Sequence, residues 1–296
     1  MNAQVAPSDS SALEPGRSLW EDAWNTLRRN KAAIVSAIII SVMAVLVILG
    51  PLLSAYDYDF TDWGNLSVGP SLENGHIFGT DTLGRDLFVR TLVGGRISLM
   101  VGIVATLVSL VIGVSYGATA GYIGGRVDHY MMRLVDILYA MPFMFFVILL
   151  MVLFGRNIVL IFVAIGAINW LDMARIVRGQ TLTLKHREFV EAAKAQGVPT
   201  FAIIRRHIVP NLLGVVAVYV TLTIPQVILV ESFLSLLGLG VQEPMTSWGA
   251  LVKEGAEELE SAPWMLIFPA VFLAATLFCF NFVGDGMRDA LDPKDR

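Results

Sequence analysis

The residues with the most suggestive chemistry form one group within the second half of the chain. Glu188 and Glu191 carry carboxylates, and Ala192, Ala193 and Gly197, which lack bulk, follow closely in the sequence. Where side chains are this small, another backbone can approach closely. We interpret the group as a surface for close contact, with a carboxylate at Glu191. The alternative is an amphipathic helix that lies on the membrane surface.

Two short helices are expected to carry this group. Good helix formers occupy Glu188–Gln196, and Gly197 is placed to cap the C-terminal end, with a proline soon after it. Thr200 can cap a second short helix that ends before Pro210. The stretch 187–211 therefore predicts a helix, a break and a second helix between two long apolar runs.

A second motif resembles a catalytic one but favours helix packing. Residues 113–117 read Gly-Val-Ser-Tyr-Gly, which matches the G-x-S-x-G pattern of serine hydrolases. That nucleophile needs a strand, a sharp turn and a helix, whereas this serine lies within a long apolar helix. Because Gly113, Gly117 and Gly121 recur every four residues, we predict a small-residue groove for close helix packing.

The sequence offers no other catalytic or metal-binding pattern. It contains no Gly-Lys dipeptide, so it has no Walker A loop for ATP. The four histidines are scattered, and the single Cys279 excludes an internal disulfide and any multi-cysteine metal site. We therefore expect a protein that is not an enzyme, binds no cofactor and has no nucleic-acid partner.

Composition places the chain in a membrane. Of its 296 residues 55% are hydrophobic and 16% are charged, with a mean hydropathy of +0.67, whereas soluble domains have about 25% charged residues. The first apolar run begins only after Lys31, which is not the layout of a cleaved signal peptide. Before it, Trp20, Trp24 and Leu27 share one face of an expected interfacial helix with Ser18–Glu21 as its capping box.

Apolar runs predict six membrane-spanning helices. Their expected ranges are 32–55, 97–122, 138–154, 158–174, 212–230 and 264–283. The fourth is expected to end in Asn169–Asp172, and Gly284–Gly286 is expected to break the sixth. Between the first two spans, Asp81 or Thr82 can cap a helix on which Asp86 and Arg90 form an i,i+4 pair.

Three residues near the fifth span are candidates for the transport pathway or an outer gate. They are Gln226, Glu231 and Phe233. An acid at membrane depth is a functional candidate, although an interfacial structural role for Glu231 is the alternative. The segment 232–240 is short, apolar and rich in glycine, so we expect a re-entrant or outer-leaflet segment that lines a cavity.

The distribution of basic residues predicts that both termini lie in the cytoplasm. With the N-terminus inside, 16 of the 21 Lys and Arg residues fall on cytoplasmic segments. The exceptions are Arg85, Arg90, Arg96, Arg156 and Lys253. This orientation also places 187–211 on the side of the membrane where ATP is present.

The spacing Glu191-Ala192-Ala193, three residues, Gly197 and then Pro210 resembles the EAA loop of ABC-importer permeases. Two positions near the end depart from that pattern, with His207 where Ile is usual and Val209 where Leu is usual. The resemblance implies that Glu188, Glu191, Ala192, Ala193, Gly197 and Pro210 belong to a coupling helix that docks in a separate ATPase subunit.

Other motifs narrow the resemblance. Gly79-Thr80-Asp81, Gly84-Arg85-Asp86, Ser247-Trp248-Gly249 and the end 284–293 are similar to the C-type permease subunit of bacterial oligopeptide or dipeptide ABC importers. The resemblance implies an all-α, multi-pass protein of the inner membrane with the type I permease fold. Its expected partners are a homologous permease subunit, two ATP-binding subunits, a periplasmic or lipid-anchored peptide-binding protein and the peptide. Nickel or another small substrate, or an ion-driven carrier, is the alternative.

This resemblance divides the chain into five parts. They are a cytoplasmic tail with an interfacial helix at 1–31, the first transmembrane helix at 32–55, a periplasmic segment at 56–96, a permease core at 97–285 that includes the coupling loop 187–211, and a cytoplasmic tail at 286–296.

Overall fold

Apolar helices dominate the computed structural model, which describes residues 19–154 and 158–291. Those ranges contain no strand. Their β-type pairing is limited to an isolated bridge between Thr80 and Asp86. The helices are α1 (Leu19–Arg29), α2 (Lys31–Leu53), α3 (Leu87–Ile123), α4 (Gly125–Ala140), α5 (Phe143–Phe154), α6 (Ile158–Leu184), α7 (Glu188–Ala195), α8 (Thr200–Ile203), the π-helical turn η1 (Ile204–Ile208), α9 (Val209–Leu236), α10 (Trp248–Glu257) and α11 (Trp264–Leu291).

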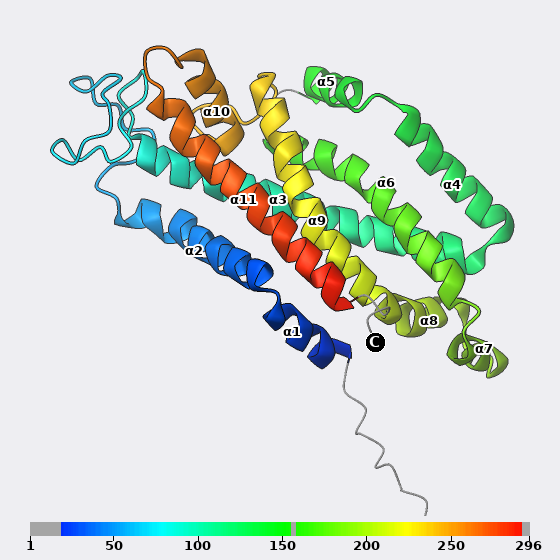
Figure 1. Cartoon of the computed structure of the whole chain (residues 1–296). Coiled ribbons are helices and arrows are strands. Elements are labelled where there is room, and N and C mark those ends of the chain that lie inside the picture. The colour runs from blue at the N-terminus through cyan, green and yellow to red at the C-terminus, as the bar shows by residue number, and fades with distance from the viewer. Residues whose placement is uncertain (1–18, 155–157, 292–296) are drawn as a thin grey trace, which may run out of the picture.

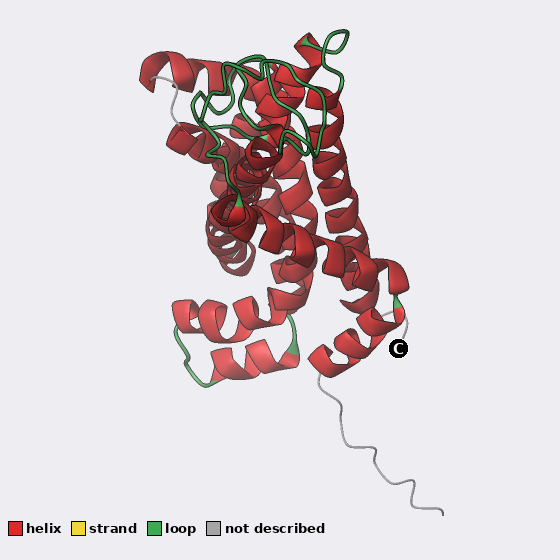
Figure 2. Ribbon diagram, turned by 90° about the vertical axis from the view of Figure 1, so that its left-hand side faces the viewer, coloured by secondary structure: helices red, strands yellow, loops and turns green. Residues whose placement is uncertain are grey.

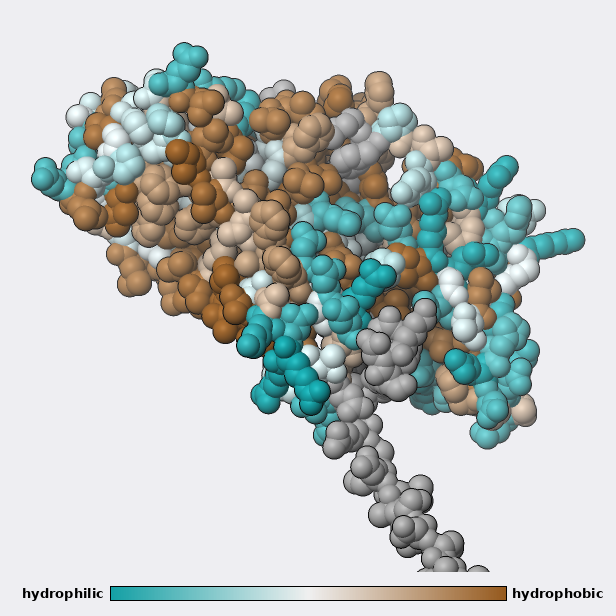
Figure 3. All heavy atoms as spheres, viewed as in Figure 1, coloured by the Kyte–Doolittle hydropathy of each residue, from teal (hydrophilic) through white to brown (hydrophobic). Residues whose placement is uncertain are grey.

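Four helices are long and apolar enough to cross a membrane. They are α2, α3, the continuous helix Thr200–Leu236 and α11. A fifth span is present if α4 and α5, which are bent by 85° relative to each other, are counted as one broken span. Hydrophobic residues form a broad band across the visible face, between hydrophilic groups at two opposite ends (Figure 3). The predicted all-α membrane protein is therefore confirmed.

The two ends of the helical bundle differ in construction. At one end lie α1, α7 and α8, and at the other lie α10 and the long loop that connects α2 to α3 (Figure 1). Turned by 90°, the molecule shows this loop folded over one end of the bundle, while a pair of short helices projects from the other end (Figure 2). Residues 1–18, 155–157 and 292–296 lie outside the described residues, and with them lie the first part of the predicted N-terminal tail, including Ser18 of its capping box, and the end of the predicted C-terminal tail.

The helix α1 occupies the position where an interfacial helix is predicted before the first span. It ends just before Asn30, whose side chain accepts a hydrogen bond from the Ala33 N–H (3.1 Å) and caps α2. Trp24 is half exposed, while Ala23 is buried. The side chain of Leu27 lies close to Gly286 of α11, so α1 rests against the end of the bundle.

Two helices are longer than the sequence predicts. The helix α3 begins at Leu87 and not near residue 97, because the Asp86 side chain accepts a hydrogen bond from the Val89 N–H (2.9 Å) and caps the helix there. Neither Asp81 nor Thr82 has this role. The helix α6 continues beyond residue 174 to Leu184, so Asn169 and Asp172 lie near its middle and not at its end.

The predicted break at Gly284–Gly286 is wrong, because α11 continues through it to Leu291. Both glycines are buried at helix contacts. A Cβ on Gly286 would lie 2.5 Å from the Cβ of Ala33 in α2, and a Cβ on Gly284 would lie 2.6 Å from a methyl carbon of Leu222 in α9. These glycines permit close packing within a helix, where the sequence pattern suggests a turn.

The glycines of α3 form the closest contact with α6. A Cβ on Gly113 would lie 2.5 Å from the Cβ of Met173, one on Gly117 would lie 2.4 Å from the carbonyl oxygen of Ala174, and one on Gly121 would lie 2.9 Å from the carbonyl oxygen of Arg178. The two helices therefore approach each other along three successive turns, at distances that any larger residue would increase.

A network of buried charges closes the end of the bundle that carries α10. The buried carboxylate of Asp81 pairs with the Arg85 Nε atom (2.6 Å) and with Arg90, whose side chain is fully buried. Arg90 also reaches Glu254 on α10 (3.1 Å), and Arg85 reaches Glu243 (3.0 Å). Burial raises the pKa of the Glu254 carboxyl, while the neighbouring Arg90 and Arg85 oppose this effect. The loop, α3 and α10 are thus held together by ion pairs.

The predicted Asp86–Arg90 pair is wrong, because each residue has another partner. Asp86 caps α3 and lies 2.8 Å from the Nδ1 atom of the buried His76, and Arg90 belongs to the Asp81 network. His76 also stacks on the ring of Tyr56, with ring centroids 4.6 Å apart. The loop between α2 and α3 is therefore held by contacts of His76 with Tyr56 near its beginning and with Asp86 at its end.

The predicted re-entrant segment 232–240 is in part ordinary helix. Residues up to Leu236 form the last turns of α9, and α10 starts only after Ser247 caps it through the Ala250 N–H (3.1 Å). The indole N–H of Trp248, which is fully buried, donates to the Thr91 carbonyl (2.9 Å) and holds α10 on α3. The segment lines a hollow of about 390 Å³ together with α10.

We expect Gly117→Ala to lower the thermal unfolding temperature of the detergent-solubilised protein. The new methyl group would overlap the carbonyl oxygen of Ala174, and overpacking of this kind costs about 1–3 kcal/mol. Gly179→Ala is the matched control, because its Cβ would meet nothing within 4 Å and because alanine has a higher helix propensity than glycine. Equal stability of the two variants would contradict the close contact between α3 and α6.

We also expect Asp81→Ala to destabilise the end of the bundle that carries α10 by about 3 kcal/mol, because it leaves the fully buried Arg90 with a single, partly exposed partner. Thermal unfolding of the purified chain measures the loss. Asp57→Asn, an exposed acid of the same loop, is the control and should have no effect. A similar small effect of both variants would show that the ion pairs contribute nothing to stability.

Candidate functional site

The helix α7 has one free face and one packed face. It projects beyond the ends of the long helices, next to α8 (Figures 1 and 2). Glu188, Glu191 and Ala192 are exposed, whereas Val190 and Ala193 are buried. The acidic and small residues that the sequence singles out are therefore open to another chain, with the exception of Ala193, which faces the protein itself.

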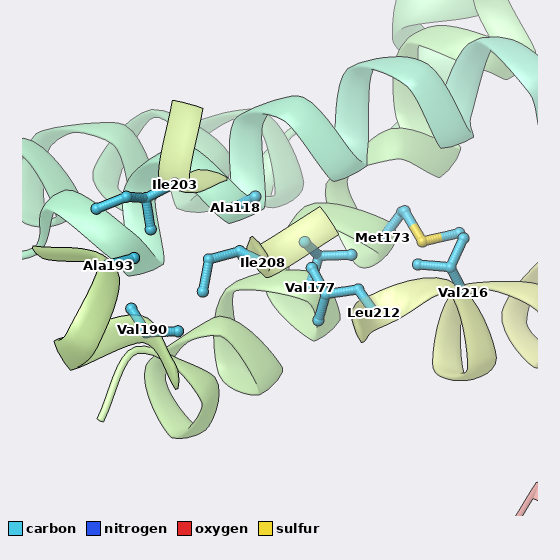
Figure 4. Close-up of a cluster of buried hydrophobic side chains, with 9 residues drawn as sticks. All are labelled: Ala118, Met173, Val177, Val190, Ala193, Ile203, Ile208, Leu212 and Val216. Atoms are coloured by element: carbon cyan, nitrogen blue, oxygen red, sulfur yellow. The ribbon is translucent and has the colours of Figure 1, made fainter. Parts of the chain in front are cut away.

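The packed face of α7 enters a hydrophobic cluster that several helices share (Figure 4). Figure 4 labels its nine buried members, which are Ala118 of α3, Met173 and Val177 of α6, Val190 and Ala193 of α7, Ile203 of α8, Ile208 of η1, and Leu212 and Val216 of α9. Because close-packed interiors transmit displacement, a shift of α7 must move its neighbours in this cluster. We call it the inner cluster.

Gly197 ends α7 in a Schellman motif, as predicted for a C-terminal cap. The Gly197 N–H donates to the Lys194 carbonyl (3.0 Å), and the Val198 N–H donates to the Ala193 carbonyl (3.1 Å). Gly197 has φ of +76°, a conformation that costs other residues energy. It is exposed, and a Cβ would meet nothing within 4 Å, so the backbone conformation and not a lack of space requires glycine.

The predicted end of the second helix before Pro210 is wrong. The helix that begins at Thr200 continues through the π-helical turn η1 into α9, and the N–H of Val209 donates to the carbonyl of Ile204. The wider π turn just before Pro210 relieves the conflict that the missing N–H and the ring would cause in a regular helix. The short helix α8, the turn η1 and the long helix α9 thus form one continuous helix, Thr200–Leu236.

A polar hollow lies between α6 and α9. Its volume is about 370 Å³. The polar residues that line it are Asn169, Asp172 and Arg175 of α6 and Tyr219, Thr223 and Gln226 of α9. The predicted pathway residue Gln226 therefore borders a hollow. Such a concave site with a few convergent polar groups is typical of small-ligand binding.

The other two pathway candidates lie elsewhere. Glu231 is fully buried, and its carboxylate accepts hydrogen bonds from Ser98 of α3 (3.3 Å) and Ser235 of α9 (2.8 Å). Ser98 in turn accepts a hydrogen bond from the N–H of Trp248 (3.1 Å). Phe233 is 48% exposed. Neither residue borders the polar hollow, and the contacts of Glu231 join α3, α9 and α10.

Comparison with known proteins agrees with this architecture. A family model described as "Binding-protein-dependent transport system inner membrane component" matches residues 109–296. The chain belongs to this family. A second model, described as the N-terminal TM domain of oligopeptide transport permease C, matches residues 18–70 of the permease.

Curated relatives match the permease over almost its whole length. The oligopeptide transport system permease protein OppC of Escherichia coli (strain K12) is 60% identical over all of this chain and 98% of its own. OppC of Haemophilus influenzae is 59% identical over 99% of this chain and 94% of its own. The dipeptide transport system permease protein DppC of Bacillus subtilis (strain 168) is 45% identical over all of this chain and 92% of its own.

Sequence reasoning missed part of the permease's polar hollow. The sequence predicts Asn169 and Asp172 at the end of a span, and it does not single out Tyr219 or Thr223 as pathway residues. The spacing of these residues does indicate a polar face. Asn169 and Asp172 are three residues apart, and Tyr219, Thr223 and Gln226 are separated by four and three residues. Such spacings place polar groups on one face of an otherwise apolar helix.

We expect Gly197→Ala to destabilise the end of α7 by about 1–2 kcal/mol, because alanine is strained at positive φ. Hydrogen exchange of the Gly197 and Val198 amides, which close the Schellman motif, should become faster. Gly197→Asn is the control and should have a smaller effect, since asparagine tolerates this conformation. Unchanged exchange in both variants would argue against a fixed α7 terminus.

Proposed function

We propose that this permease is one membrane subunit of an ATP-driven importer of oligopeptides, in which α7 couples the chain to a separate ATPase. The observation that carries the proposal is the two-sided environment of α7, with Glu188 and Glu191 exposed and Val190 and Ala193 buried in the inner cluster. The oligopeptide substrate is supported by the names of relatives that are about 60% identical over the full chain.

In the proposed topology the chain crosses the inner membrane six times, with both termini in the cytoplasm. The four clear spans, α4 with α5, and α6 supply the six. Support for α6 comes from its length of 27 residues and from its close contact with α3. The excess of Lys and Arg at the end that carries α7 supports the orientation. The loop 54–86 and α10 then lie outside the cytoplasm.

A second, homologous permease subunit would complete the pathway. Two ATP-binding subunits would bind the pair of permeases, one of them at α7 of this chain, and a peptide-binding protein would deliver the substrate to the opposite side. The chain has no Walker A loop of its own, so the energy must come from other subunits. Docking at α7 fits its exposed face, where Ala192 and Gly197 allow a close approach and Glu188 and Glu191 offer negative charge.

The mechanism follows from the two faces of α7. When ATP closes the ATPase pair, the docked α7 moves with it. Because Val190 and Ala193 pack on α3, α6, α8 and α9 in the inner cluster, this movement passes directly into the spans. The continuous helix from Thr200 to Leu236 then carries it toward the outer end. The pathway thereby alternates between inward-facing and outward-facing states.

Uptake of a labelled tripeptide into proteoliposomes tests this function. The permease is reconstituted with its operon-encoded neighbours, with and without internal ATP. Uptake that requires both ATP and the binding protein is the expected result. Uptake that is indifferent to ATP would indicate a carrier. ATPase activity that the binding protein stimulates, without peptide uptake, would indicate another small substrate such as nickel.

Two substitutions test the coupling role of α7. We expect Glu191→Lys and Gly197→Pro to lower ATP-dependent uptake at least about tenfold, as loss of a charge-assisted contact predicts, while ATP hydrolysis continues. Proline cannot adopt φ of +76° and removes the N–H that bonds to Lys194.

Asp289→Lys provides the control, because Asp289 is an exposed acid at the same end of the bundle but on α11. It should transport normally, and all variants should insert in the membrane at wild-type levels. Normal uptake by Glu191→Lys and Gly197→Pro would show that α7 is not the coupling element.

A further inference from the structure

The polar hollow lies halfway along both of the helices that form it. The helices α6 and α9 contain 27 and 28 residues, so each is about 40 Å long at 1.5 Å per residue. Asp172 lies at the middle of α6, and Thr223 lies at the middle of α9. The hollow therefore lies away from the ends of both helices.

Polar groups at such a depth are costly unless they face water or a ligand. Asp172 and Gln226 are exposed, and 36% of Tyr219 is exposed. The hollow is also rich in hydrogen-bond acceptors. The Asn169 Nδ2 atom donates to the carbonyl of Ile165 (2.8 Å), and the Thr223 hydroxyl donates to the carbonyl of Tyr219 (2.7 Å). One N–H of Asn169 and the hydroxyl hydrogen of Thr223 are thus used within their own helices, and the Asn169 side-chain oxygen and the Thr223 hydroxyl oxygen remain as acceptors.

The open charge of the hollow is negative. Arg175 also lines it, but its guanidinium bonds to the Asp136 carboxylate (2.8 Å) and stacks on the ring of Tyr139, 4.3 Å from the centroid. Within the described part of the chain, Asp172 forms no ion pair with a basic side chain. A ligand with a cationic group and several N–H donors would complement this arrangement.

We propose that the hollow is a peptide-binding station of the pathway, in which Asp172 binds the protonated α-amino group of the peptide. Asn169, Thr223 and Gln226 accept hydrogen bonds from its first backbone N–H groups. This inference rests on the proposed function as a peptide importer. The volume of about 370 Å³ is within the range of sites for small ligands, about 300–1,000 Å³, so the hollow holds one end of an oligopeptide rather than all of it.

The test compares a labelled tripeptide with its N-acetylated form, which lacks the positive charge. The complete transporter is reconstituted in proteoliposomes that contain ATP. The binding protein is saturated with one peptide or the other, and uptake of each peptide is measured. The wild type should prefer the free amino group, and Asp172→Asn should lower uptake of that peptide about tenfold, as loss of one charged contact predicts, and abolish the preference.

Three controls separate a binding role from a structural one. Asp172→Glu keeps the carboxylate and should retain the preference. Asp285→Asn removes an exposed acid of α11 that lies outside the hollow and should leave uptake unchanged. ATPase activity stimulated by the binding protein should stay normal in Asp172→Asn, which shows that the complex is assembled. A wild-type preference that persists in Asp172→Asn would overturn the proposal.

A labelling experiment decides the question if Asp172→Asn does not assemble. Thr223→Cys is introduced together with Cys279→Ser, which removes the only cysteine of this chain. A tripeptide with a free α-amino group and a bromoacetyl group on the side chain of an N-terminal ornithine should then alkylate residue 223 during ATP-driven transport. Leu229→Cys, an exposed position of the same helix outside the hollow, is the matched control.

Equal labelling of the two cysteines, or labelling of neither, would overturn the proposed station. These results are distinguishable from failure of the proposed function. If the wild-type complex takes up no peptide in the presence of ATP, the importer assignment itself fails. If it takes up peptide but the preference does not depend on Asp172, only the assignment of the hollow is wrong.

Discussion

The close contact between α3 and α6 is the constraint on which the other features depend. Gly117 lets the backbone of α3 reach the Ala174 carbonyl, and any larger residue would push the helices apart. The helix α6 carries Asp172 into the polar hollow and Met173 and Val177 into the inner cluster, and it leads directly to α7. A change in this contact would therefore move the polar hollow and α7 together.

The two ends of the bundle are stabilised by different interactions. At the end with α10, Asp81, Arg85 and Arg90 form buried ion pairs, and Trp248 and Glu231 add hydrogen bonds between α3, α9 and α10. Such directional contacts favour one geometry, because a displaced partner leaves a buried charge or polar group unpaired. At the opposite end Arg178 of α6 forms an ion pair with Asp128 of α4, but α7 itself is joined to the bundle by apolar packing of Val190 and its neighbours in the inner cluster.

This difference fits a permease that receives movement at α7. Apolar packing has no directional requirement, so neighbouring helices can shift as a group while they stay buried. The exposed Gly197 ends α7 without any side-chain contact of its own, and its backbone hydrogen bonds hold the end of the helix. The polar hollow lies between the two ends, where relative movement of α6 and α9 would change its shape.

The sequence by itself determined the class of protein, the main apolar spans, the short helix α7 and its glycine cap. These follow from composition, apolar run length and local helix signals, which depend on neighbours in sequence. Only the tertiary structure decided the roles of Gly284, Gly286, Pro210, Asp86 and Asp172. A glycine in a tight helix contact looks like a breaker, and a capping acid looks like half of an ion pair, until the partner helix is known. The polar hollow needs α6 and α9 side by side, and no local pattern specifies which two helices meet or which of their faces stay open.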